Sequence, residues 1–329
     1  MNQYDIVSIG DIVIDAFIRL KDANVHCKVD QTACELCVRF GDKVPYESVQ
    51  VVNAVGNAPN ASVSAARLGL KSALIATVGD DQNGKNCIAS LENDKVSTEY
   101  LFTSKEFPTN YHYVLWYDVE RTILVKHAPF PYALPQNMKP PKWIYLTSMG
   151  EQSLPYHQEI AAYISAHPET KLAFQPGTFQ IKLGYEKLRD IYERTELFFC
   201  NVEEAETILN TENRDIPTLM KMLRELGPKN IVVTDGIKGA YAYDGAQAWF
   251  MPVYPHTPFE RTGAGDAFAS TITSALAMGM SIDQALLWAP INSMSVVQYV
   301  GAQQGLLTRE KIEEYLKSAP ADYKPVTVA

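Results

Sequence analysis

A run of small residues near the end of the chain, Thr262-Gly263-Ala264-Gly265-Asp266, is suited to phosphoryl chemistry. We expect it to open a helix, where free backbone N–H groups and the positive end of the helix dipole attract anions. Glycines at positions 263 and 265 let the backbone approach a phosphate closely. The carboxylate of Asp266 would then lie beside the anion site.

A carboxylate repels phosphate, so its presence here needs a reason. One reason is that Asp266 accepts the proton of an attacking hydroxyl while the N–H groups stabilise the transferring phosphoryl group. The alternative is a glycine-rich helix start whose aspartate only complements the helix dipole. The segment is neither a P-loop, which ends in Gly-Lys-Ser/Thr, nor a complete G-x-G-x-x-G dinucleotide fingerprint.

The composition of the 329 residues excludes several classes of protein. The chain is 47% hydrophobic and 20% charged, which is ordinary for a globular protein. Its net charge of -9 argues against a nucleic-acid partner. The start of the chain lacks a signal-type segment and no stretch of about 18 apolar residues occurs, so no membrane contact is expected. Five cysteines are an odd number, unlike a secreted disulfide framework, and predict a cytoplasmic protein.

Predicted strands and helices alternate along the chain, which favours a doubly wound parallel sheet with helices on both faces. A hairpin is expected at 241–243 and 248–251, and residues 16–52 and 111–126 are extended segments outside this alternation. The predicted strands are 4–9, 72–78, 143–146, 171–174, 197–200 and 230–234. The predicted helices are 60–68, 84–95, 154–166, 183–194, 202–210, 216–226, 263–279, 282–300 and 309–317.

Six ordered elements make the chain, over about residues 4–316, resemble the ribokinase/PfkB family of sugar and nucleoside kinases. The resemblance implies one ribokinase-like domain spanning 1–329: a doubly wound, mostly parallel sheet flanked by helices, with a small β-sheet lid inserted at about 16–52 and 111–126. The six elements are Gly10-Asp11 with Asp15, Val55-Gly56-Asn57-Ala58-Pro59-Asn60, Val78-Gly79-Asp80-Asp81 with Gly84, Asn201 with Glu204, Thr234-Asp235-Gly236 with Gly239, and Glu260 to Phe268.

The resemblance also implies an activity and a set of site residues. The expected enzyme moves the γ-phosphate of ATP to a hydroxymethyl or hydroxyl group of a small sugar or sugar acid. Asp266 would be the general base, and Gly263, Ala264 and Gly265 the anion hole. Carboxylates and amides suit sugar hydroxyls. The implied substrate contacts are Asp11, Asp15, Gly56, Asn57 and Asn60, with ordinary loop capping as the alternative for the two aspartates.

Cofactor positions follow from the same resemblance. Asn201 and Glu204 would hold Mg²⁺, partly through water; the alternative is a helix N-cap with a capping box. Glu260 stands where many relatives have aspartate, which leaves open whether Glu260 and Thr262 hold K⁺. The implied nucleotide contacts are Thr234, Gly236 and Gly239, with Asn292 near the adenine.

The lid segments contain residues that fit more than one interpretation. His26, Cys27, Cys34 and Cys37 could form a zinc site, but we expect free, partly buried cysteines, and we expect Cys87 and Cys200 in the core. A second group flanks residues 111–126 and either packs the lid or forms an aromatic wall suited to a nucleoside base. Its members are Tyr111, His112, Tyr113, Trp116 and His127.

The substrate itself is less well defined by the sequence. The motif at Gly56-Asn57 carries no Lys or Arg, which favours an unphosphorylated sugar or sugar acid, although Arg121 could supply a cation from the lid. A nucleoside such as adenosine is the alternative within the same reaction, and Val55 replaces the first glycine of the family's usual pair. An inactive binding relative and an NAD-dependent oxidoreductase are further alternatives; the turn at Gly10 lacks the dinucleotide fingerprint. The lid either joins two copies as a homodimer or only covers the substrate.

Overall fold

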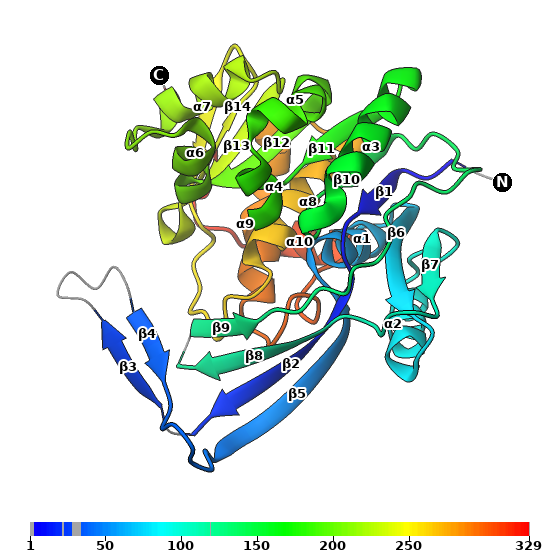
Figure 1. The fold of residues 1–329 in the computed structure, drawn as a ribbon. Coiled ribbons are helices and arrows are strands. Elements are labelled where there is room, and N and C mark those ends of the chain that lie inside the picture. Colours follow the sequence, from blue (N-terminus) through cyan, green and yellow to red (C-terminus); the bar gives the residue numbers. More distant parts are fainter. Residues whose placement is uncertain (1–2, 22, 28–33, 119, 329) are drawn as a thin grey trace.

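The structure, a computed structural model, describes residues 3–21, 23–27, 34–118 and 120–328. A large central sheet carries helices on both faces, and a smaller sheet projects from one end of the molecule (Figure 1). This arrangement confirms the predicted α/β class with a mostly parallel sheet and a separate small sheet.

Seven neighbouring strands of the central sheet run parallel, and the chain order reverses between β1 and β10. Ligands of such sheets bind beyond the carboxyl ends of the strands at this reversal. In spatial order the parallel strands are β13 (Asn230–Thr234), β12 (Thr195–Asn201), β11 (Lys171–Phe174), β10 (Trp143–Leu146), β1 (Ile6–Ile9), β6 (Ser72–Gly79) and β7 (Leu101–Ser104). Antiparallel strands extend the sheet beyond β13: β14 (Ala240–Tyr243), β15 (Ala248–Met251) and β16 (Val326–Val328).

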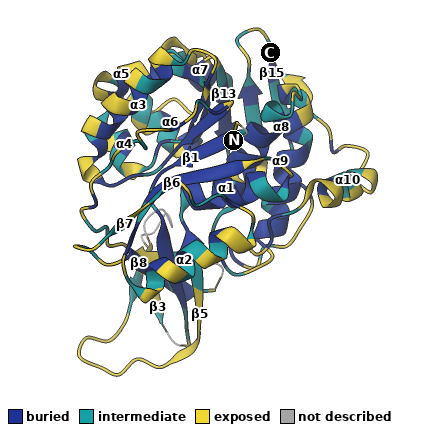
Figure 2. Cartoon of the chain, turned by 90° about the vertical axis from the view of Figure 1, so that its right-hand side faces the viewer, coloured by how far each residue is buried: buried dark blue, intermediate teal, exposed yellow. Residues whose placement is uncertain are grey.

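The central strands are apolar on both sides because helices cover both faces, as the dark strands of Figure 2 show. One face packs against α3 (Leu154–Ala166), α4 (Thr178–Leu183), α5 (Tyr185–Arg194), α6 (Val202–Leu209) and α7 (Ile216–Glu225). The other packs against α1 (Asn57–Arg67), α8 (Ala264–Ala277), α9 (Ile282–Val296) and α10 (Arg309–Lys317). Helix α2 (Gln82–Asn93) packs beside β6, and two short 3₁₀ helices are η1 (Glu151–Ser153) and η2 (Gly236–Lys238).

The smaller sheet, which we call the lid sheet, is built from both segments predicted to be extended. Its order is β5 (Tyr46–Val55), β2 (Val13–Leu20), β8 (Tyr111–Tyr117) and β9 (Glu120–Leu124). Phe17, Val114 and Trp116 are buried on its inner face, against the body of the protein. The sheet starts at Val13, three residues before the predicted boundary, because β2 continues directly from the turn after β1.

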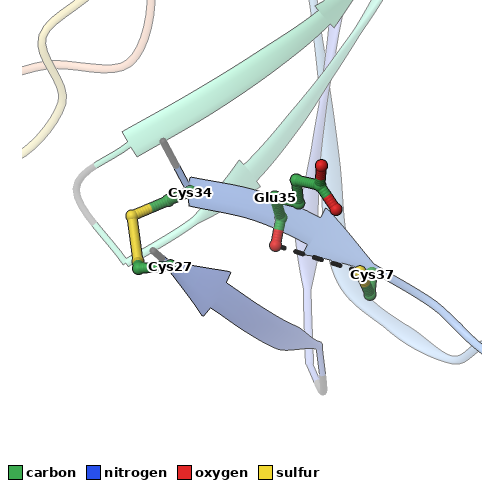
Figure 3. The surroundings of a disulfide bond; sticks show 4 residues. All are labelled: Cys27, Cys34, Glu35 and Cys37. Carbon is green, nitrogen blue, oxygen red and sulfur yellow. Dashed lines mark hydrogen bonds between the residues drawn. A yellow bond between two sulfur atoms is a disulfide. The ribbon is translucent and has the colours of Figure 1, made fainter. Parts of the chain in front are cut away.

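An exposed hairpin of β3 (Asn24–Cys27) and β4 (Cys34–Cys37) extends from the lid sheet. The antiparallel register places Cys27 opposite Cys34, with 4.0 Å between their Cα atoms, and the two form a disulfide (Figure 3). The prediction of free lid cysteines is therefore wrong for this pair.

The other cysteines lie where the sequence predicts. Cys37 is a free, half-buried thiol, and Cys87 and Cys200 are free and buried in the core. No group of three or more metal-ligating side chains occurs within the described ranges, so the zinc interpretation gains no support there.

Four details differ from the predicted elements. The helix expected at 183–194 is α5, and an unpredicted short helix, α4, precedes it; Gly184, with φ 81°, separates the two. The helix expected at 282–300 ends at Val296. Strands β7 and β16 were not predicted, because both are short and lie at the edges of the sheet.

In the described parts of the chain, no helix has the length and apolar character needed to span a membrane.

Candidate functional site

A cleft of about 630 Å³ lies between the carboxyl ends of the parallel strands and the lid sheet. Asp11, Gln175 and Thr234 reach it from the ends of β1, β11 and β13, and Ile123 and Val125 close it from the lid. The structure thus gathers most of the predicted site in one place. The predicted residues that line the cleft are Asp11, Asp15, Gly56, Asn57, Asn60, Asn201, Glu204, Thr234, Thr262, Gly263, Ala264, Gly265 and Asp266.

The segment Thr262–Gly265, which we call the anion loop after its predicted role, leads into helix α8 as expected. Gly263 is the N-cap with φ 81°, and a Cβ there would lie 2.3 Å from the Cβ of Ala302, so the backbone itself requires glycine. Gly265 has no positive φ, and a Cβ there would meet only Gln175 Nε2, at 3.9 Å. The missing side chain at 265 therefore leaves open space in the cleft rather than serving the fold.

Three amides hold the carboxylate of Asp266 in place. Asn57 Nδ2 donates to Oδ1 at 2.9 Å and Asn60 Nδ2 donates to Oδ2 at 2.8 Å. The amide of Gln175 also donates to this carboxylate, and its own oxygen accepts from the hydroxyl of Tyr145. Gln303 Nε2 in turn donates to Asn60 Oδ1 at 3.0 Å, which fixes the orientation of the Asn60 amide.

These contacts show a partner for Asn57 and Asn60 that the sequence did not suggest. Asn57 and Asn60 were predicted to contact substrate, but in this structure their amide hydrogens are directed at Asp266. Burial raises the pKa of Asp266 above its ordinary value of 3.8, and the hydrogen bonds from Asn60 and Gln175 oppose that rise. A raised pKa is typical of a carboxylate that works as a base near neutral pH.

The two aspartates near the start of the chain lie on the opposite side of the cleft. Tyr132 donates its hydroxyl to Asp11, 2.9 Å from Oδ1, and His127 Nδ1 lies 3.0 Å from Oδ2. Burial and the charge of Asp11 raise the pKa of Tyr132, so its hydroxyl stays protonated and can donate. The capping alternative does not describe Asp11, whose side chain lines the cleft.

Asp15 lies within strand β2 and is 8% exposed, so the alternative of loop capping is wrong for this residue. Its Oδ1 lies 3.5 Å from His112 Nδ1. Neither Asp15 Oδ1 nor His112 Nε2 has a hydrogen-bond partner among the described residues. Buried polar atoms without partners are costly, and these two face a cleft that a polar ligand could fill.

Asn201 and Glu204 form the capping box that was the alternative to a metal site. Asn201 Oδ1 accepts from the Glu204 N–H at 2.8 Å, and Glu204 Oε2 accepts from the Asn201 N–H at 2.9 Å. Both residues also line the cleft. Burial raises the pKa of Glu204, and the charges of Glu203 and Asp266 add to this effect. A cation would relieve that excess of negative charge.

Glu260 is fully buried beneath the anion loop and does not line the cleft. Its Oε1 accepts from the backbone N–H of Thr262 at 2.8 Å and from the Thr262 hydroxyl at 2.6 Å. Its Oε2 accepts from the Gly301 N–H at 3.4 Å. The carboxylate therefore ties the start of the anion loop to the segment after α9.

A second cavity, of about 160 Å³, adjoins the cleft and shares Thr234, Ala264 and Gly265 with it. Gly236 and Gly239, predicted to contact nucleotide, line this cavity. Asn292, predicted to lie near the adenine, does not line this cavity. That side chain is fully buried between α8 and α9, where it donates to Thr271 Oγ1 and accepts from the Leu307 N–H, each at 2.8 Å. The α9 residues that line the cavity are Pro290, Ser293 and Met294.

The aromatic residues of the second lid segment pack the lid and do not form a wall of the cleft. Trp116 is buried against Phe259, with 5.2 Å between ring centroids, and Tyr113 is half exposed beside Tyr111. Of that predicted group, only His112 and His127 line the cleft.

Sequence reasoning missed Gln175, Phe179 and Gln303. Gln175 directly follows a predicted strand, which was a usable signal because the carboxyl ends of parallel strands meet at one edge. Phe179 lines the cleft from α4 and lies edge-on to His127, with 6.1 Å between centroids. No local pattern marks Gln303, whose partner Asn60 is 243 residues away in sequence.

Comparison with known proteins identifies the family. The model of the pfkB family of carbohydrate kinases matches residues 5–309. The chain is 30% identical over 288 residues to a ribokinase of Bacillus subtilis, covering 84% of this chain and 92% of that protein. It is 25% identical to a nucleoside kinase of Methanocaldococcus jannaschii, covering 83% of this chain and 90% of the relative.

The fold agrees with this assignment. A solved structure of Arabidopsis thaliana ribokinase complexed with ribose and ATP superimposes with a TM-score of 0.79 at 17% identity, covering 96% of this chain and 99% of that one. The chain therefore belongs to the pfkB family of carbohydrate kinases, and it is an ATP-dependent kinase of that family.

Proposed function

We propose that the cleft transfers the γ-phosphate of ATP to a hydroxymethyl or hydroxyl group of a small sugar or sugar acid. The observation that carries this proposal is the position of Asp266, held by three amides beside the open amides of Gly263–Gly265. This arrangement joins a base of raised pKa to a set of anion donors, which is what in-line transfer to an alcohol requires.

In the proposed mechanism, the acceptor lies between Asp266 and the two aspartates across the cleft. Asp11 and Asp15 bind hydroxyl groups of the substrate, and His112 Nε2 offers a further partner. Asp266 accepts the proton of the reacting hydroxyl as its oxygen attacks the γ-phosphorus. The bond from phosphorus to the bridging oxygen breaks, and ADP leaves with that electron pair.

The anion donors stabilise the phosphoryl group while it is transferred. The N–H groups of Gly263, Ala264 and Gly265 point their partial positive charge at the oxygens of the transferring phosphoryl group, and the α8 dipole adds to it. Removing one such donor costs about 10²–10³-fold in kcat in well-studied enzymes. The nucleotide base occupies the second cavity, whose walls are mainly apolar or glycine.

Asn201 and Glu204 are the proposed Mg²⁺ residues. Their capping box uses Glu204 Oε2 and Asn201 Oδ1 and leaves Glu204 Oε1 and the Asn201 amide outside the cap. The buried negative charge near Glu204 fits a cation held partly through water. A divalent cation there supplies charge neutralisation for the ATP phosphates.

A nucleoside such as adenosine is the second candidate acceptor. Phe179 favours it, because a ring that lines the cleft next to His127 offers a face for a base. The lid aromatics Tyr111, Tyr113 and Trp116 give no such support, since none of them lines the cleft. The polar array around Asp15 weighs towards the sugar or sugar acid.

ATP turnover with ribose, fructose, 2-keto-3-deoxygluconate, adenosine and cytidine tests the proposal and separates its two versions. We expect turnover with a sugar or sugar acid, and a Phe179→Ala variant that keeps it within about sixfold, since burial against one ring face is worth little more than ~1 kcal/mol. Exclusive turnover of a nucleoside with strong loss in Phe179→Ala selects the second candidate. Failure to phosphorylate any of the five acceptors, despite ATP binding, contradicts both candidate acceptor classes.

We also propose that the outer face of the lid sheet joins two copies of the chain. Register places Val51, Ala16, Tyr113 and Leu124 side by side in one row, and Val51, Tyr113 and Leu124 are each about half exposed. Such an apolar face is typical of an interface. Sedimentation of the wild type and of Val51→Lys tests this: we expect a dimer for the first and a monomer for the second, and a monomeric wild type contradicts it.

The need for ATP leads us to propose a cytoplasmic location. The structure contains the Cys27–Cys34 disulfide, and a reducing cytoplasm, which keeps thiols free, is expected to open this bond in the cell. Alkylation of thiols in cell extract, followed by mass analysis, checks this; a pair protected from alkylation contradicts the location.

A further inference from the structure

Two charge pairs connect the lid sheet with the anion loop, and in each pair the arginine of one segment faces the glutamate of the other. Glu120 and Arg121 are adjacent on β9, and Glu260 and Arg261 are adjacent before α8. Arg261 Nη1 lies 2.8 Å from Glu120 Oε1, and Arg121 Nε lies 4.0 Å from Glu260 Oε1. The Trp116–Phe259 ring contact lies at the same junction.

The two pairs differ in burial, and therefore in what each contributes. The side chains of Glu120 and Arg261 are 64% and 46% exposed, so water screens their attraction. The side chain of Glu260 is 0% exposed and that of Arg121 is 29% exposed. A buried carboxylate needs a positive partner, and losing that partner is costly. Arg121 is the cation that the structure places at Glu260.

The surroundings of Glu260 do not fit an alkali cation. A bound K⁺ needs oxygens with free lone pairs turned towards it. Here Glu260 Oε1 already accepts two hydrogen bonds from Thr262, and Oε2 faces the Gly301 N–H. The positively charged group that approaches Glu260 Oε1 is the guanidinium of Arg121. Each contact of the Glu260 carboxylate described above is therefore with a hydrogen-bond donor or a positive charge.

Arg121 also has unused hydrogen-bonding capacity at the site. Its Nε is buried without a hydrogen-bond partner among the described residues, and the side chain lines the cleft. Its charge favours the ionised form of Asp266, so it is close enough to act on the base as well. The guanidinium thus lies between the buried carboxylate below the loop and the cleft above it.

We infer that Arg121 supplies, from the lid, the positive charge that balances buried Glu260, so that the anion loop keeps its shape without an alkali cation. Arg121 is a positioning residue that acts through Glu260 and Thr262. The anion loop is consequently complete only while β9 is docked on it, which links closure of the lid to readiness for transfer. This inference rests on the proposed function for its kinetic consequences.

Five variants test the inference: Arg121→Gln, Glu260→Gln, the double variant Arg121→Gln/Glu260→Gln, Arg121→Lys and Glu120→Gln. Arg121→Gln is expected to lose about 10²-fold in kcat with little change in the KM for ATP, because the loop shifts while nucleotide contacts remain. Arg121→Lys keeps the charge and most of kcat. The double variant recovers about tenfold over Arg121→Gln, because no buried charge is left unbalanced. Glu120→Gln stays within about fivefold of the wild type.

The cation is tested by replacing KCl with tetramethylammonium chloride at constant ionic strength. The wild type is expected to keep the same kcat and the same Tm in both salts. A saturable rise of either quantity with K⁺ overturns the inference, as does full kcat and unchanged Tm in Arg121→Gln. A purely structural Arg121 lowers Tm without the selective loss of kcat, and that result also overturns it.

The Tm measurements separate this inference from the proposed function. They need no substrate, so coupling between Arg121 and Glu260 in the unfolding of the single and double variants is measurable even in a chain that phosphorylates none of the acceptors offered. If the Tm losses of the two single variants add up in the double variant, the pairing is refuted. If the losses are coupled but the chain is inactive, only the proposed function is refuted.

Discussion

A single methyl group added at Gly265 is expected to stop phosphoryl transfer while leaving the fold intact. Gly265 lies in the first turn of α8 and lines both cavities. Its backbone does not need glycine, because φ is not positive and the nearest atom to an added Cβ is Gln175 Nε2, at 3.9 Å. The methyl group of Gly265→Ala would therefore occupy the cleft and nothing else.

The size of both effects follows from this geometry. Alanine in place of glycine within a helix stabilises by about 0.5–1 kcal/mol, which corresponds to a Tm increase of roughly 1–3 °C for a chain of this size. The same methyl group covers the amides that we assign to the anion hole. Loss of one such donor reduces kcat by about 10²–10³-fold.

Gly263→Ala is the matched control, because the same change at this position has the opposite effect on the fold. At φ 81° an alanine is strained by about 1–2 kcal/mol, and its Cβ would clash with Ala302 at 2.3 Å. We therefore expect a lower Tm for Gly263→Ala and a Tm at or above wild type for Gly265→Ala.

Thermal unfolding and steady-state ATP turnover of the two variants form the assay. A stable Gly265→Ala protein with normal kcat refutes the assignment of this loop as the anion hole. A destabilised Gly265→Ala protein refutes the argument that the space above Gly265 belongs to the ligand.

Three further predictions concern the neighbouring groups. Because burial raises the pKa of Asp266 above 3.8, the base becomes protonated at a higher pH than an ordinary aspartate; kcat should fall as pH decreases, with its midpoint above 3.8, and a profile flat down to about pH 4 contradicts this. Glu204→Gln is expected to raise the Mg²⁺ concentration for half-maximal turnover by about 10–100-fold without changing the acceptor KM, and an unchanged Mg²⁺ requirement rejects the metal assignment. Gln303→Leu leaves Asn60 Oδ1 without its donor and should lower kcat by about 5- to 100-fold; full activity in a folded variant shows that Asn60 needs no support.

The sequence predicted the site residues that belong to short, contiguous segments of the chain. The helix start at Gly263–Asp266 and the strands ending near Asp11, Asn201 and Thr234 are contiguous signals, and parallel topology brings such ends together. The central strands were predictable because burial on both faces produces short, continuous apolar runs.

The remaining features depend on pairs that are distant in sequence. Asn57 and Asn60 reach Asp266 across 209 and 206 residues, and Arg121 reaches Glu260 from a different sheet. No periodicity encodes such a partner, so the sequence did not reveal these contacts. The Cys27–Cys34 disulfide depends on the register of β3 and β4, and Asn292 on which face of α9 meets α8; spacing alone determines neither.

The most direct test of the account is the rate of phosphoryl transfer by Asp266→Asn, with the ATP affinity of the same variant measured in parallel. Removal of a general base lowers transfer by about 10²–10⁴-fold, while ATP affinity is expected to stay near wild type because the nucleotide cavity is unchanged. Near-normal transfer by this variant, with any acceptor that the wild type phosphorylates, would contradict the role of Asp266 and the mechanism built on it.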